Sequence, residues 1–101
     1  MPKYKKSLFI FRRDLRLEDN TGLVYALKNS DKVIPCFIID TEIMNELKKS
    51  IFRIKFLNES LIDLDEQLHK KKSNLKIFKG RTEDCLKRII SEQKIDRVFV
   101  N

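Results

Sequence analysis

The stretch of sequence that decides the fold is FRRDLRLEDN, which runs from Phe11 to Asn20. It follows an apolar run, Leu8 to Phe11, which is typical of a strand buried on both faces of a sheet. The apolar run ends abruptly at a group of arginines that alternate with acids and leucines, namely Arg12, Arg13 and Arg16. A strand that leads into such a loop predicts an ordered turn with a structural or binding role.

Two interpretations of this loop remain open. In the first, Leu15 and Leu17 turn inward while Asp14 and Asp19 pair with neighbouring guanidinium groups, which makes a local clamp. In the second, the arginines hold a phosphate, a carboxylate or the acidic surface of another domain, because a guanidinium group recognises planar anions well. Both roles are compatible with different residues of the same loop.

Strand and helix patterns alternate along the whole chain. Asn20 is a predicted N-cap, with Leu23, Val24 and Leu27 on one face of the helix that follows. The remaining apolar runs predict strands over Val33–Ile39, which contains Pro35, over Leu75–Phe78 and over Arg97–Val100. Because proline cannot donate a hydrogen bond to a sheet, we expect Pro35 near a strand start or at a bulge.

The longest helix is predicted to begin after Ser50, which is a plausible N-cap. Thr41–Lys49, which precedes it, is predicted to be an irregular or briefly helical connector. A last helix is predicted to begin at Thr82. Apolar residues at three- and four-residue spacings predict a continuous buried stripe along the long helix: Phe52, Phe56, Leu57, Leu61, Leu64 and Leu68.

This alternation predicts an α/β fold with a parallel sheet and helices on both faces. Right-handed crossovers favour a Rossmann-like half-fold with strand order 3-2-1-4, in which ligands bind beyond the carboxyl ends of the strands where the order reverses. The loop from Arg12 and the terminal Asn101 would both lie there. Because the sequence stops straight after its fourth strand, we expect residues 1–101 to be one incomplete domain that is truncated there.

Composition limits the classes of function. Hydrophobic residues make up 42% and charged residues 37% of the chain, and 22 Lys and Arg against 15 Asp and Glu give a net charge of +7. That charge favours a nucleic-acid partner, but the lysines are spread over every segment, which favours an ordinary solvated surface. No membrane span or signal peptide is apparent, so we expect a cytoplasmic protein. Cys36 and Cys85 lack metal-site spacing and are expected to be buried, while the single His69 is expected at a solvated helix end.

The usual catalytic motifs are missing. Only Gly22 and Gly80 are glycines, so neither a dinucleotide fingerprint nor a phosphate-binding P-loop is present. No metal-ligand cluster or nucleophile–base pair is apparent, and we expect no catalytic residue and no metal site.

Two further residues are candidates for ligand contact. Arg53, in the first turn of the long helix, is either an ordinary exposed arginine or points toward an anionic or polar planar ligand. Asp40, at the end of the second strand, is either a loop cap or a partner of Arg53 or of such a ligand.

The motif FRRDLRLxDN closely resembles the opening of the DNA photolyase and cryptochrome family. The pattern Ser50-x-x-Arg53-x-x-Phe56-Leu57-x-Glu59-Ser60-Leu61 is similar to a second signature of that family. Leu75–Gly80 and Val98-x-x-Asn101 also match its layout, so the resemblance covers essentially all of the chain and maps it onto the N-terminal α/β domain.

The resemblance implies a light-harvesting domain. In this family the domain holds an antenna chromophore, commonly methenyltetrahydrofolate or 8-hydroxy-5-deazaflavin, which passes excitation energy to FAD. By resemblance, Asp40, Arg53 and Asn101 lie near the antenna groove, and the loop with Arg12, Arg13, Asp14, Arg16, Asp19 and Asn20 is structural or contacts another domain. FAD and the damaged DNA belong to a C-terminal helical domain that is absent from this sequence.

Three functions follow as alternatives. The first is the antenna domain of a photolyase, whose parent uses blue light and FAD to split pyrimidine dimers, with this piece inactive alone. The second is a cryptochrome-type photosensor. The third is a free-standing nucleotide-binding α/β module similar to stress-protein domains. Because the last strand would be uncovered, we also expect self-association through Val98, Phe99 and Val100.

Overall fold

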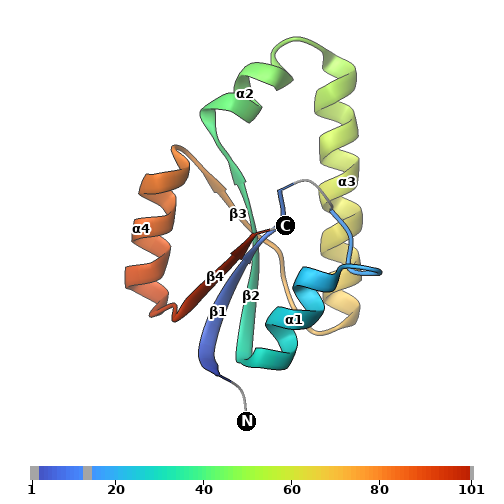
Figure 1. Ribbon diagram of the computed structural model, residues 1–101. Coiled ribbons are helices and arrows are strands. Elements are labelled where there is room, and N and C mark those ends of the chain that lie inside the picture. The colour runs from blue at the N-terminus through green and yellow to red at the C-terminus, as the bar shows by residue number, and fades with distance from the viewer. Residues whose placement is uncertain (1–2, 13–14, 101) are drawn as a thin grey trace.

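The computed structural model describes residues 3–12 and 15–100, and its core is a four-stranded sheet. All pairings are parallel and the strand order is β3-β2-β1-β4, which confirms the predicted topology (Figure 1). The strands are β1 (Tyr4–Ile10), β2 (Ser30–Ile39), β3 (Lys76–Lys79) and β4 (Arg97–Val100).

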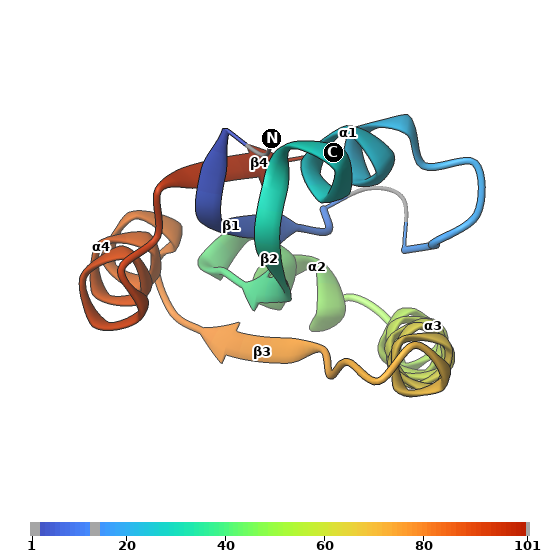
Figure 2. The same cartoon turned by 90° about the horizontal axis from the view of Figure 1, so that it is seen from below.

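Helices cover both faces of this sheet, as the alternation predicted. Figure 2 shows α1 (Thr21–Asn29) and α3 (Ile51–Lys70) on one face and α4 (Thr82–Gln93) on the other. A short helix, α2 (Thr41–Leu47), lies beyond the end of β2 and leads into α3 (Figure 1). The segment expected to be irregular or briefly helical is therefore helical over most of its length.

Two hydrophobic clusters, one on each face, hold these layers together. Phe9 and Phe37 pack against α1 and α3 through Leu23 and Leu64, while the alternate strand positions pack against α4. That second cluster contains Leu8, Ile10, Cys36, Ile38, Cys85 and Ile89. Because both faces of β1 are buried, its sequence is apolar at successive positions rather than alternating.

Pro35 lies in the middle of the ten-residue β2, and not at the strand start or bulge that the sequence predicted. It is opposite Phe9 of β1, whereas the pairing with β3 begins only at the next residue, Cys36 opposite Lys76. Pro35 therefore lies one residue before the pairing with β3 begins, so its missing N–H costs no hydrogen bond to that strand.

Two predicted helix caps are confirmed. The Oδ1 of Asn20 accepts a hydrogen bond from the Leu23 amide at 3.0 Å, and the Oγ of Ser50 accepts one from the Phe52 amide at 3.2 Å. The predicted face of α1 is partly wrong, because Leu23 and Ala26 are buried while Val24 and Leu27 are about half exposed.

The predicted stripe on α3 is buried only in its second half. Leu61, Leu64 and Leu68 are buried, but Phe52 and Phe56 are 80% and 73% exposed. The cause is length, since a helix of 20 residues is about 30 Å long whereas the adjacent edge strand β3 has four residues and spans about 13 Å. The start of α3 therefore extends past the sheet beside α2 (Figure 1).

Both cysteines are buried on the face covered by α4, as predicted, and neither forms a disulfide. Burial, with a smaller contribution from Cys85, raises the pKa of the Cys36 thiol to about 12. His69 lies in the exposed last turn of α3, as predicted, with Nδ1 3.7 Å from a carboxylate oxygen of Asp65.

Candidate functional site

A hollow of about 180 Å³ opens at the carboxyl ends of β1, β2 and β4. This is where the strand order reverses, because β1 has β2 on one side and β4 on the other. Its walls are mostly apolar, and Arg12, Asp40 and Thr82 supply the polar groups. The apolar lining residues are Ile10, Phe11, Phe37, Ile38, Ile43, Leu86 and Val100.

Asp40 joins two helix starts at the rim of this hollow. Its Oδ1 accepts a hydrogen bond from the Ile43 amide at 2.9 Å, which caps α2. Its Oδ2 accepts one from the Thr82 hydroxyl at 3.2 Å, which ties the start of α4 to the end of β2. The carboxylate is therefore a cap, one of the two roles that the sequence left open for it.

A second, more open hollow of about 240 Å³ continues from the first. The two share Asp40 and Thr82, and the second adds residues from the starts of α2 and α4: Thr41, Glu42, Arg81 and Glu83. We call the two together the switch-point groove. Thr82, Ile43 and Leu86 were not predicted as site residues. Thr82 could have been found, since the helix that follows a parallel strand begins at the same end of the sheet as Asp40.

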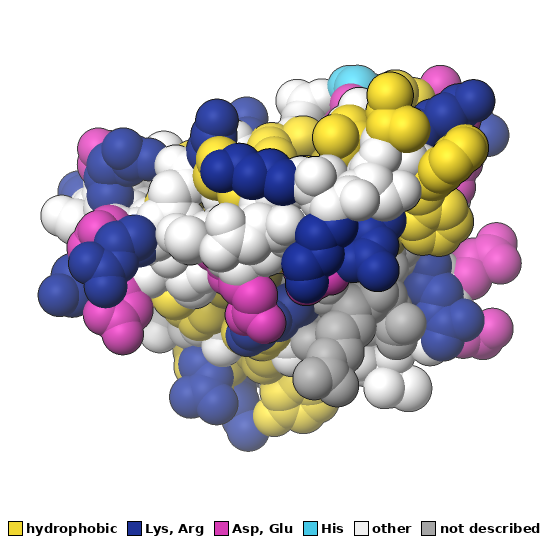
Figure 3. Space-filling model, turned by 90° about the horizontal axis from the view of Figure 1, so that it is seen from above, with side chains coloured by type: hydrophobic (Ala, Val, Ile, Leu, Met, Phe, Trp, Pro, Cys, Tyr) yellow, Lys and Arg dark blue, Asp and Glu magenta, His cyan; other side chains and the backbone are white. Residues whose placement is uncertain are grey.

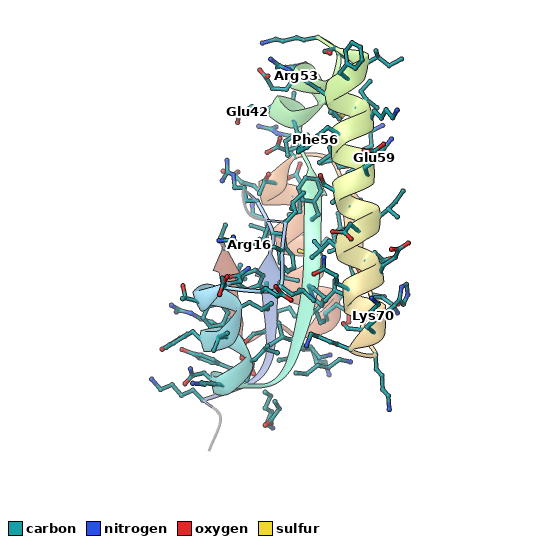
Figure 4. The ribbon with its side chains drawn as sticks, turned by 90° about the vertical axis from the view of Figure 1, so that its right-hand side faces the viewer. Arg16, Glu42, Arg53, Phe56, Glu59 and Lys70 are labelled. Atoms are coloured by element: carbon teal, nitrogen blue, oxygen red, sulfur yellow. The ribbon has the colours of Figure 1, made fainter. Side chains whose placement is uncertain are left out.

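Arg53 lies outside the switch-point groove. Its guanidinium group forms an ion pair with Glu46 of α2, which also binds Lys49 at 2.9 Å. Figure 4 shows Arg53 and Phe56 near the start of α3, with Glu42 beside them on α2. The pairing of Arg53 with Asp40 that the sequence allowed is therefore absent, because each has another partner.

The cations around Glu46 change its ionisation. The hydrogen bond and charge of Lys49, followed by those of Arg53, lower the pKa of the Glu46 carboxyl below its usual value. All three side chains are about half exposed or more, so these ion pairs contribute little to the stability of the fold. Their main effect is to orient the Arg53 side chain toward Glu46.

The arginine-rich loop divides between two places. Arg12 lines the switch-point groove, whereas Arg16 lines a separate open hollow with Gln67 and Lys70 of α3. Figure 4 shows Arg16 far from Arg53. Of the residues that topology and the resemblance placed at this groove, Arg12 and Asp40 line it, whereas Arg16 and Arg53 do not. Arg13, Asp14 and Asn101 lie outside the described residues.

Apolar packing and Asn20 hold this loop. Leu15 and Leu17 are half-buried against the cluster under α1 and α3, as predicted. The Nδ2 of Asn20 donates to the Arg16 carbonyl at 3.1 Å while its Oδ1 caps α1. Asp19 has a left-handed backbone (φ 54°) and forms no ion pair with the described residues, so the predicted clamp is not seen there.

The described residues offer neither a metal site nor a membrane-spanning helix. Within residues 3–12 and 15–100, no group of three His, Cys, Asp or Glu side chains is arranged to hold a metal ion. Over the same residues, none of the helices combines the length and apolar character that a membrane crossing requires.

A known protein family matches nearly the whole chain. The family described as DNA photolyase matches residues 7–101 of the sequence. The chain belongs to the DNA photolyase family. Its four-stranded parallel sheet is that of the N-terminal α/β domain in that family, as the resemblance implied.

Its relatives include both a photolyase and cryptochromes. The chain is 40% identical to the (6-4)DNA photolyase of Arabidopsis thaliana, over 91% of this chain and 18% of that protein. It is 38% identical to Cryptochrome-1 of Aedes aegypti, over 87% of this chain and 17% of that protein. It therefore spans about a fifth of the length of these relatives.

A solved structure gives the same fold. The archaeal photolyase from Sulfolobus tokodaii, crystallised with two FAD molecules that imply a novel light-harvesting cofactor, is 48% identical. The match has a TM-score of 0.83 and covers 95% of this chain and 22% of that one.

Proposed function

We propose that this chain is the light-harvesting domain of a deoxyribodipyrimidine photolyase. In the parent protein, an antenna chromophore held by this domain absorbs light and passes the excitation energy to FAD. The reduced flavin then splits pyrimidine dimers in DNA. The flavin and the damaged DNA belong to a C-terminal helical domain, and the 101 residues alone catalyse no repair. A cytoplasmic location is part of the proposal, supported by two unpaired cysteines.

The observation that carries this proposal is the switch-point groove. Its mainly apolar walls and few polar rim groups suit a planar conjugated ring with a polar tail. At about 180 Å³, the hollow is smaller than the roughly 300–1,000 Å³ of typical cofactor pockets, so a chromophore would extend beyond it over the open rim. Methenyltetrahydrofolate, 8-hydroxy-5-deazaflavin and a flavin are the candidate chromophores. The two FAD molecules of the Sulfolobus tokodaii relative support the flavin.

A cryptochrome-type photosensor is the second candidate. The observation in its favour is the 38% identity to Cryptochrome-1 of Aedes aegypti. A repair assay of the parent protein on DNA with pyrimidine dimers separates the two, since a photosensor absorbs the same light and repairs nothing. The free-standing nucleotide-binding module is the weaker alternative, because the chain belongs to the photolyase family and lacks a glycine-rich phosphate loop.

Arg53 tests whether the antenna reaches the start of α3. In the complete parent protein, Arg53→Ala should weaken antenna binding, because it removes a cation about one helical turn from the exposed ring of Phe56 on α3. The purified variant should lose at least half of its antenna absorption band and repair slowly in dim light at antenna wavelengths. Repair under direct flavin excitation should be nearly unchanged, because the antenna collects light and breaks no bond.

Lys49→Ala is the matched control, since Lys49 is an exposed cation that binds the same Glu46. It should retain the full antenna band. If Arg53→Ala also retains a full band, or loses repair equally at both wavelengths, Arg53 is structural and the antenna lies within the switch-point groove alone.

A further inference from the structure

A basic hollow lies at the opposite end of the sheet from the switch-point groove. It measures about 370 Å³ and is lined by three lysines from different segments, Lys32 of β2, Lys72 after α3 and Lys76 of β3. The other polar lining residues are uncharged, namely Ser73, Asn74 and Gln93, and none of its lining residues is acidic. We call it the lysine pocket.

The sheet register brings these strand lysines to one face. Cys36 of β2 packs under α4, so the two-residue alternation of a strand places Lys32 on the same face. Lys76 is opposite Cys36 in the parallel pairing and shares that face. Lys6 of β1 is directly opposite Lys32. Like charges opposite each other on adjacent strands are destabilising, so this arrangement lowers stability unless an anion compensates it.

No described carboxylate neutralises the lysine pocket. The ion pairs among the described residues involve Glu46 and Asp65, and neither pairs with a pocket lysine. Asp65 instead accepts a hydrogen bond from the Leu75 amide at 2.9 Å. Asp96 accepts its hydrogen bonds from the backbone amides of Lys5 and Lys6.

Helix electrostatics explain only part of this cluster. The carboxyl end of a helix carries a partial negative charge, which stabilises nearby cations. This effect accounts for Lys72, which follows the last turn of α3. Lys32 and Lys76 come from strands and receive no such stabilisation. The apolar wall formed by Pro35, Phe78 and Ile89 gives the pocket a surface on which a flat ring can rest.

We propose that the lysine pocket binds the phosphate group of a nucleotide or polynucleotide. Lysine ammonium groups bind phosphate as point charges, and three of them around one hollow attract its negative charge. The apolar wall beside them would contact the base. This site is separate from the proposed antenna site, since the two hollows share no residue.

The test uses the 101-residue chain at low salt, with ADP and a fluorescently labelled single-stranded oligodeoxythymidylate as probes. Binding is measured by anisotropy for the oligonucleotide and by amide chemical-shift changes for ADP. The pocket variant is Lys32→Ala/Lys76→Ala. The control is Lys28→Ala/Lys87→Ala, which removes the same charge from α1 and α4, outside the lysine pocket. Circular dichroism verifies that each variant is folded.

The pocket variant should bind at least about tenfold more weakly, since two charge-assisted contacts are lost, while the control stays within about twofold of the parent chain. If the oligonucleotide binds, the slope of log affinity against log salt should fall by about 1.4 for two lost contacts. Binding of ADP but not the oligonucleotide identifies a mononucleotide site, and the reverse identifies a polynucleotide site. Equal weakening in both variants, or no binding of either probe at low salt, overturns the proposal.

Discussion

Replacing Leu64 with alanine should strongly destabilise the fold, because this side chain joins α3 to the sheet. Leu64 is 0% exposed and belongs to the cluster that contains Phe9 and Phe37. Leucine-to-alanine changes at such sites cost about 2.7–5.0 kcal/mol, through lost burial and the cavity that remains. Taking about 3 kcal/mol, and about 4–8 °C per kcal/mol for a domain of this size, the melting temperature should fall by about 12–24 °C.

The assay is urea and thermal unfolding followed by far-UV circular dichroism. Ile62→Ala is the control, since Ile62 is only two residues away on α3 but 59% exposed. It should cost less than about 1 kcal/mol. If Leu64→Ala leaves no folded protein to measure, Leu64→Met, which keeps the volume, should cost less than about 1.5 kcal/mol. Equal effects of Leu64→Ala and Ile62→Ala would refute the packing of α3 described above.

Two further predictions concern the cysteine cluster and the edge strand. As pH rises from 9 toward 12, the free energy of unfolding should fall, because the unfolded thiol ionises above its pKa of 9.0 while folded Cys36 ionises only near about 12. In urea unfolding at several pH values, Cys36→Ala should show a smaller fall, and an unchanged fall would show that other groups cause it. The chain should also self-associate through the edge strand β4, where Val100 is 54% exposed. Light scattering at high concentration should detect this association, and Val100→Lys should reduce it; a strictly monomeric parent chain would contradict the prediction.

Topology was readable from the sequence because strand and helix periodicities differ. Continuous apolar runs such as Leu8–Phe11 predicted buried strands, and Asn20 and Ser50 predicted helix starts. The structure confirms these predictions. Right-handed crossovers then left few possible strand orders. The amphipathic stripe on α3 was harder to interpret. Periodicity shows which residues share a face, but not whether the sheet is long enough to cover Phe52.

The candidate site was predictable in position more than in detail. Its place at the carboxyl ends of the strands follows from topology, which puts Asp40 and Arg12 at the switch-point groove. The partners of charged side chains did not follow, because they depend on the direction of α2. The α2 helix places Glu46 next to Arg53, and Asp40 caps the start of the same helix.

The surface at the start of α3 is also apolar. Figure 3, which looks onto this end of the molecule, shows hydrophobic side chains gathered there.

A variant that fills the switch-point groove tests the proposal that this groove binds an antenna chromophore. Val100 lines the hollow and is half exposed, so Val100→Trp should place a ring there without disturbing the buried core. Ile90→Trp is the control, because Ile90 is a partly exposed residue of α4 outside the groove. The measurement is the absorption spectrum and the wavelength dependence of dimer repair for both variants of the full-length parent. Val100→Trp should abolish the antenna band and the repair driven at its wavelength while flavin-driven repair persists, and Ile90→Trp should change neither. A full antenna band in Val100→Trp would contradict the assignment of this groove to a chromophore.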